Sequence, residues 1–316
     1  MQLKAHERVD YMRLLTRSDF DGLACGTLLK ALGLITKWKF VHPKDLQDGL
    51  VEINDDDILC NVPYAEGCKM WFDHHSSEVE RLDKAITVDG ECRIAPSCAR
   101  VVYEYYTKAG HDLTYFDEMI KYVDKVDSGD LTAEEIQNPS DWILLGLLMD
   151  PRTGLGRFRD FRISNYELME LLMEVCRTKD IKEIMQLEDV KERVELYQEQ
   201  NELFKQMILA HTRTDANVII TDLRGVQPIY TGNRFLIYSL FPQCNISLWI
   251  VDGRGKLNCP IAVGHSILNR SSNTNVGSLM LKNGGGGHKQ VGTCQVPYDD
   301  ADKVINELIA TMKTDG

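Results

Sequence analysis

The first 110 residues alternate short apolar runs with helical patterns, and this alternation limits the fold more than any other feature of the chain. Four runs have the character of buried strands: residues 9–16, 37–42, 58–60 and 70–72. Helical patterns occupy residues 22–34 and 97–109. Strands that alternate with helices form parallel sheets covered by helices. We therefore expect an α/β fold with a doubly wound, mainly parallel sheet, whose ligands bind at the carboxyl ends of the strands.

Two polar motifs begin where an expected strand ends. Residues 16–22 (TRSDFDG) follow the first strand, and residues 71–75 (WFDHH) close the fourth. Asp19 and Asp21 are two positions apart, so their carboxylates point the same way on an extended segment. Paired carboxylates suit a hard divalent cation, although an Asp-x-Asp-Gly segment also suits a turn or a helix N-cap. The acids of residues 124–130 (DKVDSGD) and the two histidines supply further ligands, which favours a metal site.

The second half of the chain predicts a connector followed by a smaller domain. Residues 181–211 are strongly charged, contain no Gly or Pro and carry apolar residues at helical spacing. Strand and helix patterns then resume, at residues 217–221, 246–251, 260–263 and 301–312. We expect a first domain over 1–190, a connecting helix over 191–214 and a smaller α/β domain over 215–316.

A run of four glycines, Gly284, Gly285, Gly286 and Gly287, precedes His288 and Lys289. Successive glycines let backbone N–H groups approach an anion closely. The spacing does not match a Walker loop. A flexible linker is the alternative, but a helix pattern precedes the run and a strand pattern follows it. The run therefore predicts a phosphate-binding loop.

The composition excludes several classes of protein. The net charge of −12 disfavours a protein that coats long duplex nucleic acid, but leaves room for a small nucleotide or a short single-stranded oligonucleotide. The nine cysteines have no Cys-x-x-Cys spacing and are interpreted as reduced, buried residues. No apolar stretch suits a membrane span or a targeting signal, so we expect a cytoplasmic location and no membrane partner. A homodimer is compatible with these features.

Taken together, the motifs resemble those of the DHH-family phosphoesterases. The matching segments are residues 18–22 (SDFDG), 73–75 (DHH), 127–129 (DSG) and 284–288 (GGGGH), in this order over nearly the whole chain. The family contains manganese-dependent exopolyphosphatases, oligoribonucleases, single-strand exonucleases and cyclic-dinucleotide phosphodiesterases. The sequence is most similar to its exopolyphosphatase-related and oligoribonuclease-like members. The resemblance implies a DHH domain, a connecting helix, a DHH-associated C-terminal domain and manganese or magnesium as cofactor.

The resemblance also implies roles for individual residues of the first domain. Asp19, Asp21, His74 and Asp127 match the metal ligands, with Asp124 as the alternative to Asp127.

Asp73 would orient His74, and His75 would face the scissile phosphate. In the second domain, Arg270, Ser271 and the glycine run with His288 would hold the phosphates of the substrate.

Two positions depart from the family pattern. Arg17 stands where a histidine is usual, and Asn61 stands where an aspartate usually bridges two manganese ions. A guanidinium cannot ligate a metal, and an amide oxygen bridges poorly because it lacks charge. We therefore expect one ion to bind firmly at Asp21, His74 and Asp127, with Asn61 as a weak ligand. Arg17 would replace a second ion and clamp a phosphate oxygen.

These features predict a metal-dependent phosphoesterase that cuts short oligonucleotides or small nucleotide phosphodiesters in a cleft between two domains. The resemblance implies that the metal activates the attacking water. Arg17, Asp19, Asp21, Asp73, His74 and His75 would form the catalytic group. Two alternatives stay open. One is an exopolyphosphatase, which would need a row of cations; the other is a nucleotide sensor whose activity is weakened by Arg17 and Asn61.

Overall fold

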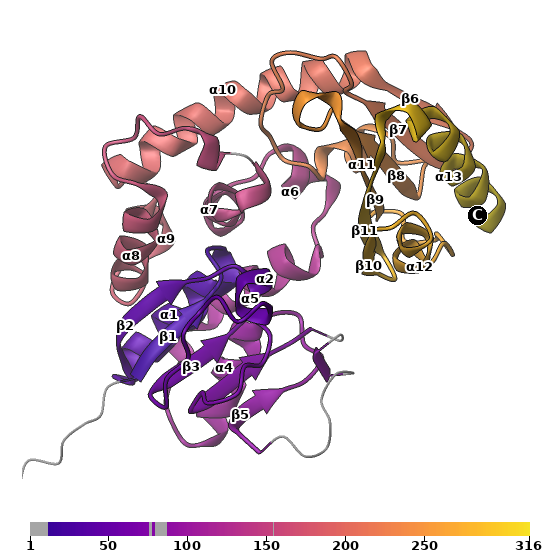
Figure 1. Ribbon diagram of the computed structural model, residues 1–316. Helices are drawn as coiled ribbons and strands as arrows, with labels where there is room; N and C mark the ends of the chain where they lie inside the picture. The colour runs from indigo at the N-terminus through magenta and orange to yellow at the C-terminus, as the bar shows by residue number, and fades with distance from the viewer. Residues whose placement is uncertain (1–11, 76–77, 80–86, 154) are drawn as a thin grey trace, which may run out of the picture. The chain divides into compact units, whose positions relative to one another are not determined.

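The computed structural model describes residues 12–75, 78–79, 87–153 and 155–316. The chain divides into two compact units, coloured along the chain in Figure 1. Unit 1 contains the described residues up to Asp130, then Ser140–Pro151 and Gly156–Arg193. Unit 2 contains Leu131–Pro139, a short stretch from Arg152 to Leu155, and Val194–Gly316. The division falls within the long helix α10 (Glu188–His211), and two short segments of the expected first domain belong to unit 2.

Unit 1 is built on a five-stranded, fully parallel sheet with the order β2-β1-β3-β4-β5. Its strands are β1 (Met12–Thr16), β2 (Ile35–Phe40), β3 (Asp57–Cys60), β4 (Met70–Asp73) and β5 (Asp89–Cys92). Its helices include α1 (Phe20–Ala31), α2 (Pro43–Gln47), α4 (Cys98–Lys108), α5 (Asp117–Ser128), α7 (Asp141–Met149), α8 (Asn165–Val175) and α9 (Ile181–Ile184). The expected α/β class and parallel sheet are confirmed. Residues 9–11 of the first expected strand lie outside the described residues.

Alternate residues of the strands face opposite sides of this sheet, as the pleat requires. Leu15, Leu59 and Trp71 pack on one face with Leu46 of α2. On the other face the ring of Phe72 meets Tyr105 of α4, with the ring centroids 5.1 Å apart. Helix α1 packs on α4, α5 and α8 in the same unit. The carboxyl ends of β1, β3 and β4 are thereby brought next to the beginnings of α1 and α4.

Unit 2 contains a six-stranded mixed sheet with the order β10-β11-β9-β8-β7-β6. Its strands are β6 (Thr212–Asp215), β7 (Val218–Asp222), β8 (Ile246–Ile250), β9 (Asn258–His265), β10 (Gly286–His288) and β11 (Val291–Pro297). Its helices include α6 (Ala133–Gln137), α11 (Leu236–Leu240), α12 (Val276–Leu281) and α13 (Ala301–Asp315). Strands β7 and β8 pair in parallel, whereas the other neighbouring strands pair antiparallel.

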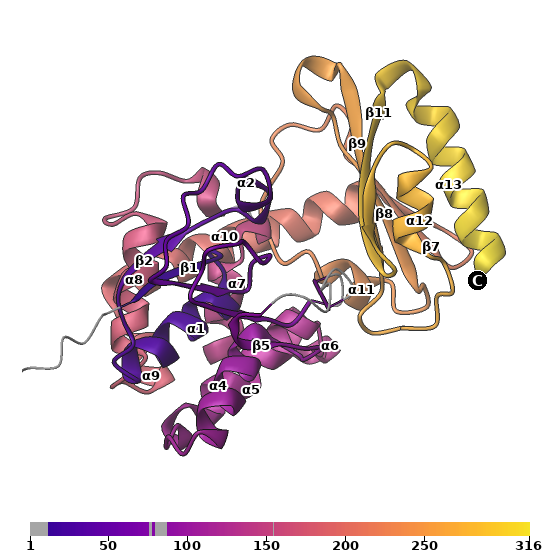
Figure 2. The ribbon, with the colours of Figure 1, turned by 60° about the horizontal axis from the view of Figure 1, so that its bottom comes forward.

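Helices cover both faces of the sheet in unit 2. The buried side chains of α12 and α13 form one hydrophobic core with β7, β8, β9 and β11. Figure 2 shows α12 and α13 on one side of the strands. On the other face Phe204 of α10 stacks on Trp249 of β8. No helix among the described residues has both the length and the apolar character needed to cross a membrane.

Candidate metal centre

The first motif forms the turn between β1 and α1. Asp19 is the N-cap of α1, because its Oδ1 accepts a hydrogen bond from the Gly22 N–H at 2.9 Å. A Cβ on Gly22 would lie 2.1 Å from the carbonyl oxygen of Arg17, so only glycine fits where the helix begins. The N-cap alternative for this segment therefore holds for Asp19, and it leaves Asp21 in the first turn of the helix.

Asp21 is 1% exposed, and its carboxylate receives the first N–H groups of α4. Oδ2 accepts from the Cys98 N–H at 2.9 Å, and Oδ1 accepts from the Ala99 N–H at 2.7 Å. A helix N-terminus stabilises a carboxylate in this position. Burial nevertheless raises the pKa of Asp21 to about 6, and the nearby Asp19 charge adds to the rise. The nearby positive charge is thus too small to offset the burial of the Asp21 carboxylate.

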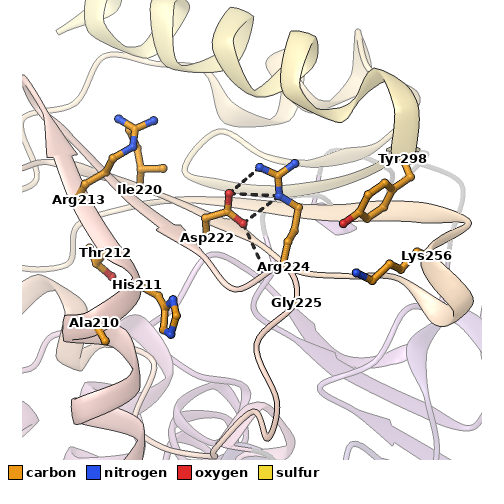
Figure 3. Close-up of a pocket in the computed structure, with 10 residues that line it drawn as sticks. All are labelled: Ala210, His211, Thr212, Arg213, Ile220, Asp222, Arg224, Gly225, Lys256 and Tyr298. Carbon is orange, nitrogen blue, oxygen red and sulfur yellow. Dashed lines mark hydrogen bonds and ion pairs between the residues drawn. The ribbon is translucent and has the colours of Figure 1, made fainter.

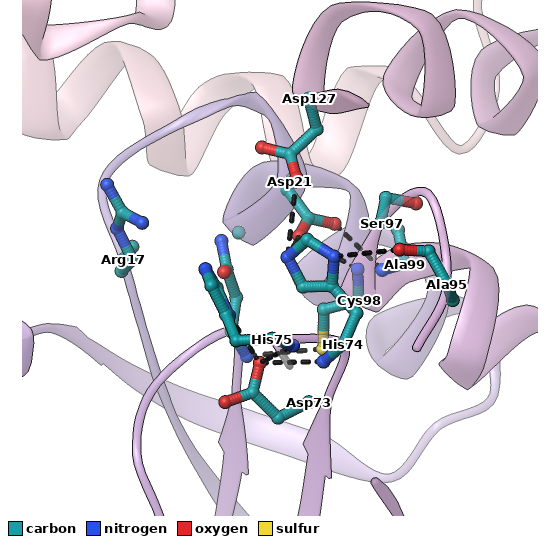
Figure 4. Close-up of polar contacts among 12 residues, drawn as sticks. Arg17, Asp21, Asp73, His74, His75, Ala95, Ser97, Cys98, Ala99 and Asp127 are labelled. Atoms are coloured by element: carbon teal, nitrogen blue, oxygen red, sulfur yellow. Dashed lines mark hydrogen bonds and ion pairs between the residues drawn. The ribbon is translucent and has the colours of Figure 1, made fainter. Parts of the chain in front are cut away.

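His74 and Asp127 complete a group of three ligands around this carboxylate (Figure 4). Nε2 of His74 lies 3.7 Å from Oδ2 of Asp21 and 3.3 Å from Oδ2 of Asp127. Nδ1 of His74 lies 3.1 Å from the carbonyl oxygen of Ala95. That carbonyl can only accept, so Nδ1 carries the proton and the lone pair is on Nε2.

The electrostatics of the three ligands favour the binding of a cation. Partial burial raises the pKa of Asp127 to about 7, and the charge of Asp21 contributes further. Burial lowers the pKa of His74, but Asp21 and Asp127 outweigh it and raise the pKa above its usual value. Nε2 of His74 is buried and makes no hydrogen bond to any described residue. Two carboxylates and one imidazole whose ligand atoms lie within 4.8 Å of one another fit a divalent cation.

Asp73 orients the second histidine of the motif, which corrects the expected pairing with the ring of His74. Oδ1 of Asp73 lies 2.7 Å from Nδ1 of His75 and also accepts the His74 backbone N–H at 2.7 Å. The ring of His74 is held by Ala95 instead. Asp73 is fully buried, whereas the side chain of His75 is 32% exposed. The carboxylate therefore fixes a proton on Nδ1 of His75 and leaves Nε2 for a ligand.

Arg17, Asp19 and Asn61 form a second polar group beside the three ligands. Nε of Arg17 lies 3.1 Å from Oδ2 of Asp19, and Nδ2 of Asn61 donates to Oδ1 of Asp19 at 3.0 Å. Asp19 is not part of the group formed by Asp21, His74 and Asp127. The oxygens of Asp19 instead accept hydrogen bonds from the Gly22 N–H and the Asn61 amide and form an ion pair with Arg17. Oδ1 of Asn61 is buried and makes no hydrogen bond to any described residue, so it is the oxygen that this group still offers to a cation.

The structure separates the two alternatives for the fourth acid. Asp124 accepts from the Ser97 hydroxyl at 2.7 Å and from Nε and Nη2 of Arg100 at 2.9 and 2.6 Å. Asp124 is not part of the group formed by Asp21, His74 and Asp127, whereas Asp127 lies one turn later with its Oδ2 3.3 Å from Nε2 of His74. Asp124 instead fastens the start of α4.

Sequence reasoning missed this contribution of residues 95–99. The segment supplies the Ala95 carbonyl to His74 and two N–H groups to Asp21, and Ser97 is the N-cap of α4. The signal was present, because a serine opens a helical pattern there. Its partners could not be read from the sequence, since they lie 21 to 78 residues earlier.

Three buried cysteines pack beneath the site. The Sγ atoms of Cys25, Cys60 and Cys98 lie within 4.8 Å of one another, and all three residues are fully buried. Burial raises the pKa of each thiol well above its usual value, so the thiols stay protonated. The Cys98 thiol donates to the Phe72 carbonyl oxygen and accepts from the Asn61 N–H. These contacts fix the ends of β3 and β4.

The glycine run has a different local structure from the expected loop. Gly286, Gly287 and His288 form β10, which pairs with β11. The N–H groups of Gly284 and Gly285 donate to the carbonyl oxygens of Leu281 and Met280 at the end of α12. The N–H groups of Gly284 and Gly285 are thus bonded within the protein, and a role of the run in binding phosphate stays a prediction.

Close backbone packing explains two of the four glycines. A Cβ on Gly285 would lie 2.0 Å from the Thr293 carbonyl oxygen, and one on Gly287 would lie 2.3 Å from that of Val291. Gly284 has a φ of 74°, which favours glycine. A Cβ on Gly286 meets no atom within 4 Å.

The other expected substrate residues also belong to unit 2. Arg270 is exposed, and its Nε donates to the Ile267 carbonyl oxygen. The Ser271 hydroxyl donates to Oδ1 of Asn269 and accepts from Nδ2 of Asn245. Their role toward a substrate stays a prediction, as does that of His288.

Comparison with solved structures gives a match of high identity. A pGpG-specific phosphodiesterase, PggH from Vibrio cholerae, is 48% identical, with a TM-score of 0.85 over 96% of this chain and 100% of that one. The DHH domain of a member of the S1p family of ribosomal proteins has a TM-score of 0.56 at 13% identity, over 95% of this chain and 87% of that one. RecJ from Thermus thermophilus in complex with Mn²⁺ has a TM-score of 0.51 at 12% identity, over 95% of this chain and 52% of that one. No protein-family model matches the sequence, and no curated protein matches it.

Proposed function

Because the chain belongs to the DHH family of metal-dependent phosphoesterases, we propose that it is a phosphodiesterase that hydrolyses short linear dinucleotides such as pGpG to nucleoside monophosphates. The observation that carries the substrate is the 48% identity to a pGpG-specific phosphodiesterase over that protein's full length. The donor set of unit 1 supports the reaction class, because phosphoester hydrolysis needs a charged centre that a dication can provide.

We assign one divalent cation, manganese or magnesium, to Asp21, His74 and Asp127. When bound, the cation activates water and neutralises charge on the phosphoryl oxygens. The protein prepares the ligands by holding a proton on Nδ1 of His74 through Ala95, so that Nε2 faces the other two ligands, and by fixing both oxygens of Asp21 on α4. Ligands fixed in this way need no rearrangement when the cation binds.

Arg17 takes the place of a second cation in this proposal. Asp19 and Asn61 form the hydrogen-bonded base that positions its guanidinium. The side chain of Arg17 is 30% exposed, so its remaining N–H groups are accessible to a phosphate oxygen. A guanidinium is always charged and binds phosphate through two parallel hydrogen bonds.

His75 supplies the second donor to the phosphate. Asp73 holds the proton on Nδ1 and stabilises the ring when both nitrogens are protonated. Nε2 then donates a hydrogen bond to a phosphoryl oxygen, where negative charge develops during the reaction. Arg270, Ser271 and His288 are the predicted contacts for the remaining part of the dinucleotide.

Hydrolysis assays with purified protein test the function directly. We expect release of GMP from pGpG with Mn²⁺ or Mg²⁺, and much slower cleavage of polyphosphate and of an aryl phosphodiester. His74→Ala should abolish GMP release, whereas His111→Ala, at an exposed histidine outside the site, should not. Faster release of phosphate from polyphosphate than of GMP from pGpG would overturn the proposal. Binding of pGpG without turnover would indicate the sensor.

A further inference from the structure

Unit 2 contains a pocket that the proposed reaction does not use (Figure 3). Its volume is about 570 Å³, within the usual range for sites of small ligands. The pocket is lined by the end of α10, by β6 and β7, and by segments that follow β7, β8 and β11. The lining residues are Ala210, His211, Thr212, Arg213, Ile220, Asp222, Arg224, Gly225, Lys256 and Tyr298. We call this the Arg213 pocket.

The Arg213 pocket lies where the parallel pair β7 and β8 ends. Asp222 is the last residue of β7 and pairs with Ile250, the last residue of β8. Ligands of α/β sheets bind outside the carboxyl ends of parallel strands. The glycine run lies at and before β10, which is one edge of the sheet, whereas β6 is the other edge. The pocket beside β6 and β7 is therefore separated from the glycine run by the width of the sheet.

The lining of the pocket is rich in cations although the chain as a whole is acidic. The lining contains three cations, Arg213, Arg224 and Lys256, and one carboxylate, Asp222, in a protein with a net charge of −12. Asp222 is already engaged, since it accepts from Nε and Nη2 of Arg224 at 2.9 and 2.6 Å. These bonds outweigh the effect of burial and lower the pKa of Asp222. The lining thus holds more positive than negative charge.

The cations differ in how far their charge is already neutralised. Arg224 also donates to Asp302, and Nζ of Lys256 lies 3.6 Å from Oδ2 of Asp252. Arg213 is exposed on the edge strand β6 and forms no ion pair with any residue that the structure describes. The guanidinium of Arg224 has five N–H groups, and its carboxylate partners do not use all of them. Arg213 is therefore the free charge of the pocket, and Arg224 is a fixed donor beside it.

We propose that the Arg213 pocket is an anion site that binds the phosphate group of a small soluble ligand. Arg213 supplies the unpaired charge, Arg224 and His211 supply further hydrogen-bond donors, and the pocket is large enough for a phosphate ester. Charge-assisted hydrogen bonds to a guanidinium are the strongest contacts that a protein surface offers to phosphate. The site shares no residue with the metal centre, so its ligand does not need to be the substrate.

Titration of the full-length protein with inorganic phosphate, followed by ³¹P NMR in the presence of Mg²⁺, tests the site. Arg213→Glu should weaken binding by at least about tenfold, because it replaces the free cation with an anion. Lys37→Glu is the matched control, since Lys37 is an exposed cation on β2, the edge strand of the sheet in unit 1. It should bind phosphate as the wild type does. His74→Ala, which removes a metal ligand of unit 1, should keep the phosphate binding that Arg213→Glu weakens.

Three results would overturn the proposal: no binding by the wild type up to millimolar phosphate, equal binding by Arg213→Glu, or loss of binding in His74→Ala alone. Circular dichroism of each variant shows whether it is folded, and Lys256→Gln provides a second variant that should also weaken binding. The phosphate group belongs either to a nucleotide or to free inorganic phosphate, and a titration of His74→Ala with 5′-GMP distinguishes these two ligands. Tighter binding of GMP than of phosphate identifies a nucleotide, and equal binding identifies the free ion.

Discussion

At the scale of single residues, the site depends on which hydrogen-bond partner each acid has. Asp19 and Asp21 are two positions apart, yet one caps α1 and the other receives the N-terminus of α4. Asp124 and Asp127 lie one turn apart on α5, yet only Asp127 lies beside His74. Similar carboxylates therefore have different chemistry, because their neighbours differ.

Exchange of these two acids for amides separates their roles. Asp127→Asn should lower metal affinity and turnover of pGpG by about a hundredfold or more, because it removes a charged ligand. Asp124→Asn should keep metal binding within about tenfold, because Asp124 contacts Ser97 and Arg100 but not the ligand group. Isothermal titration with Mn²⁺ and steady-state kinetics measure both effects. Loss of metal binding in Asp124→Asn together with normal binding in Asp127→Asn would reverse the assignment.

The raised pKa values predict how stability depends on pH. Folding raises the pKa of Asp21 from 3.8 to about 6 and that of Asp127 from 3.8 to about 7. Between about pH 4 and pH 7 the folded protein binds more protons than the unfolded chain, so without metal its free energy of unfolding falls as pH rises. The raised pKa of His74 acts in the same direction, because the stability it contributes below its usual 6.5 is lost as pH rises through the folded value.

Bound metal should reverse this trend, because a cation binds the deprotonated carboxylates and its affinity rises with pH. Urea unfolding from pH 5 to pH 8, with EDTA and with excess Mg²⁺, measures both slopes. The difference between the wild type and Asp127→Asn isolates the site from the other acids. Equal slopes for the two proteins in EDTA would show that these carboxylates are not coupled to folding.

At the scale of elements, strand ends and helix beginnings assemble the site. The first N–H groups of helix α4 bond to Asp21, and Asp124 bonds to Arg100 in its first turn, so the position of α4 and that of the metal ligands are linked. In unit 2 the glycine run is a packed hairpin whose glycines let β10 approach β11. These glycines therefore have a structural role, whether or not they also contact a ligand.

Alanine substitutions in the hairpin test this structural role. Gly285→Ala and Gly287→Ala should each cost about 1–3 kcal/mol of stability, because the new Cβ meets backbone atoms that cannot move aside. Gly286→Ala should change stability by less than about 0.5 kcal/mol, since its Cβ meets open space. Urea unfolding of the three variants provides the comparison. Equal losses at the three positions would contradict the packing argument.

The sequence was sufficient for the elements that carry strong periodicity. The parallel sheet and the helices α1 and α4 could be predicted, because buried strands and helices alternate in this part of the chain. Strand β5 was missed because Asp89–Cys92 is partly exposed and has no apolar run. The partner of Asp73 was assigned to the wrong histidine, because two adjacent histidines look alike in the sequence and only the folded backbone decides which ring meets the carboxylate. The Ala95 carbonyl could not be predicted, since a backbone group leaves no trace in the sequence.

At the scale of the whole molecule, net charge determines which substrates can approach. A net charge of −12 repels a long polyanion, whereas a dinucleotide needs only the local cations of the site. We expect turnover of pGpG to exceed that of a 20-nucleotide single strand by about tenfold or more at physiological salt. Chromatographic analysis of products from strands of increasing length measures this. Equal rates on long and short strands would contradict the expectation.

The most direct measurement of the central claim is a Mn²⁺ titration of metal-free protein in which bound metal and GMP release from pGpG are followed in the same samples. The account predicts that turnover saturates when one cation is bound per chain, and that Asp127→Asn loses both the cation and the activity. Two tightly bound cations per chain at saturation, or full turnover by Asp127→Asn, would contradict it.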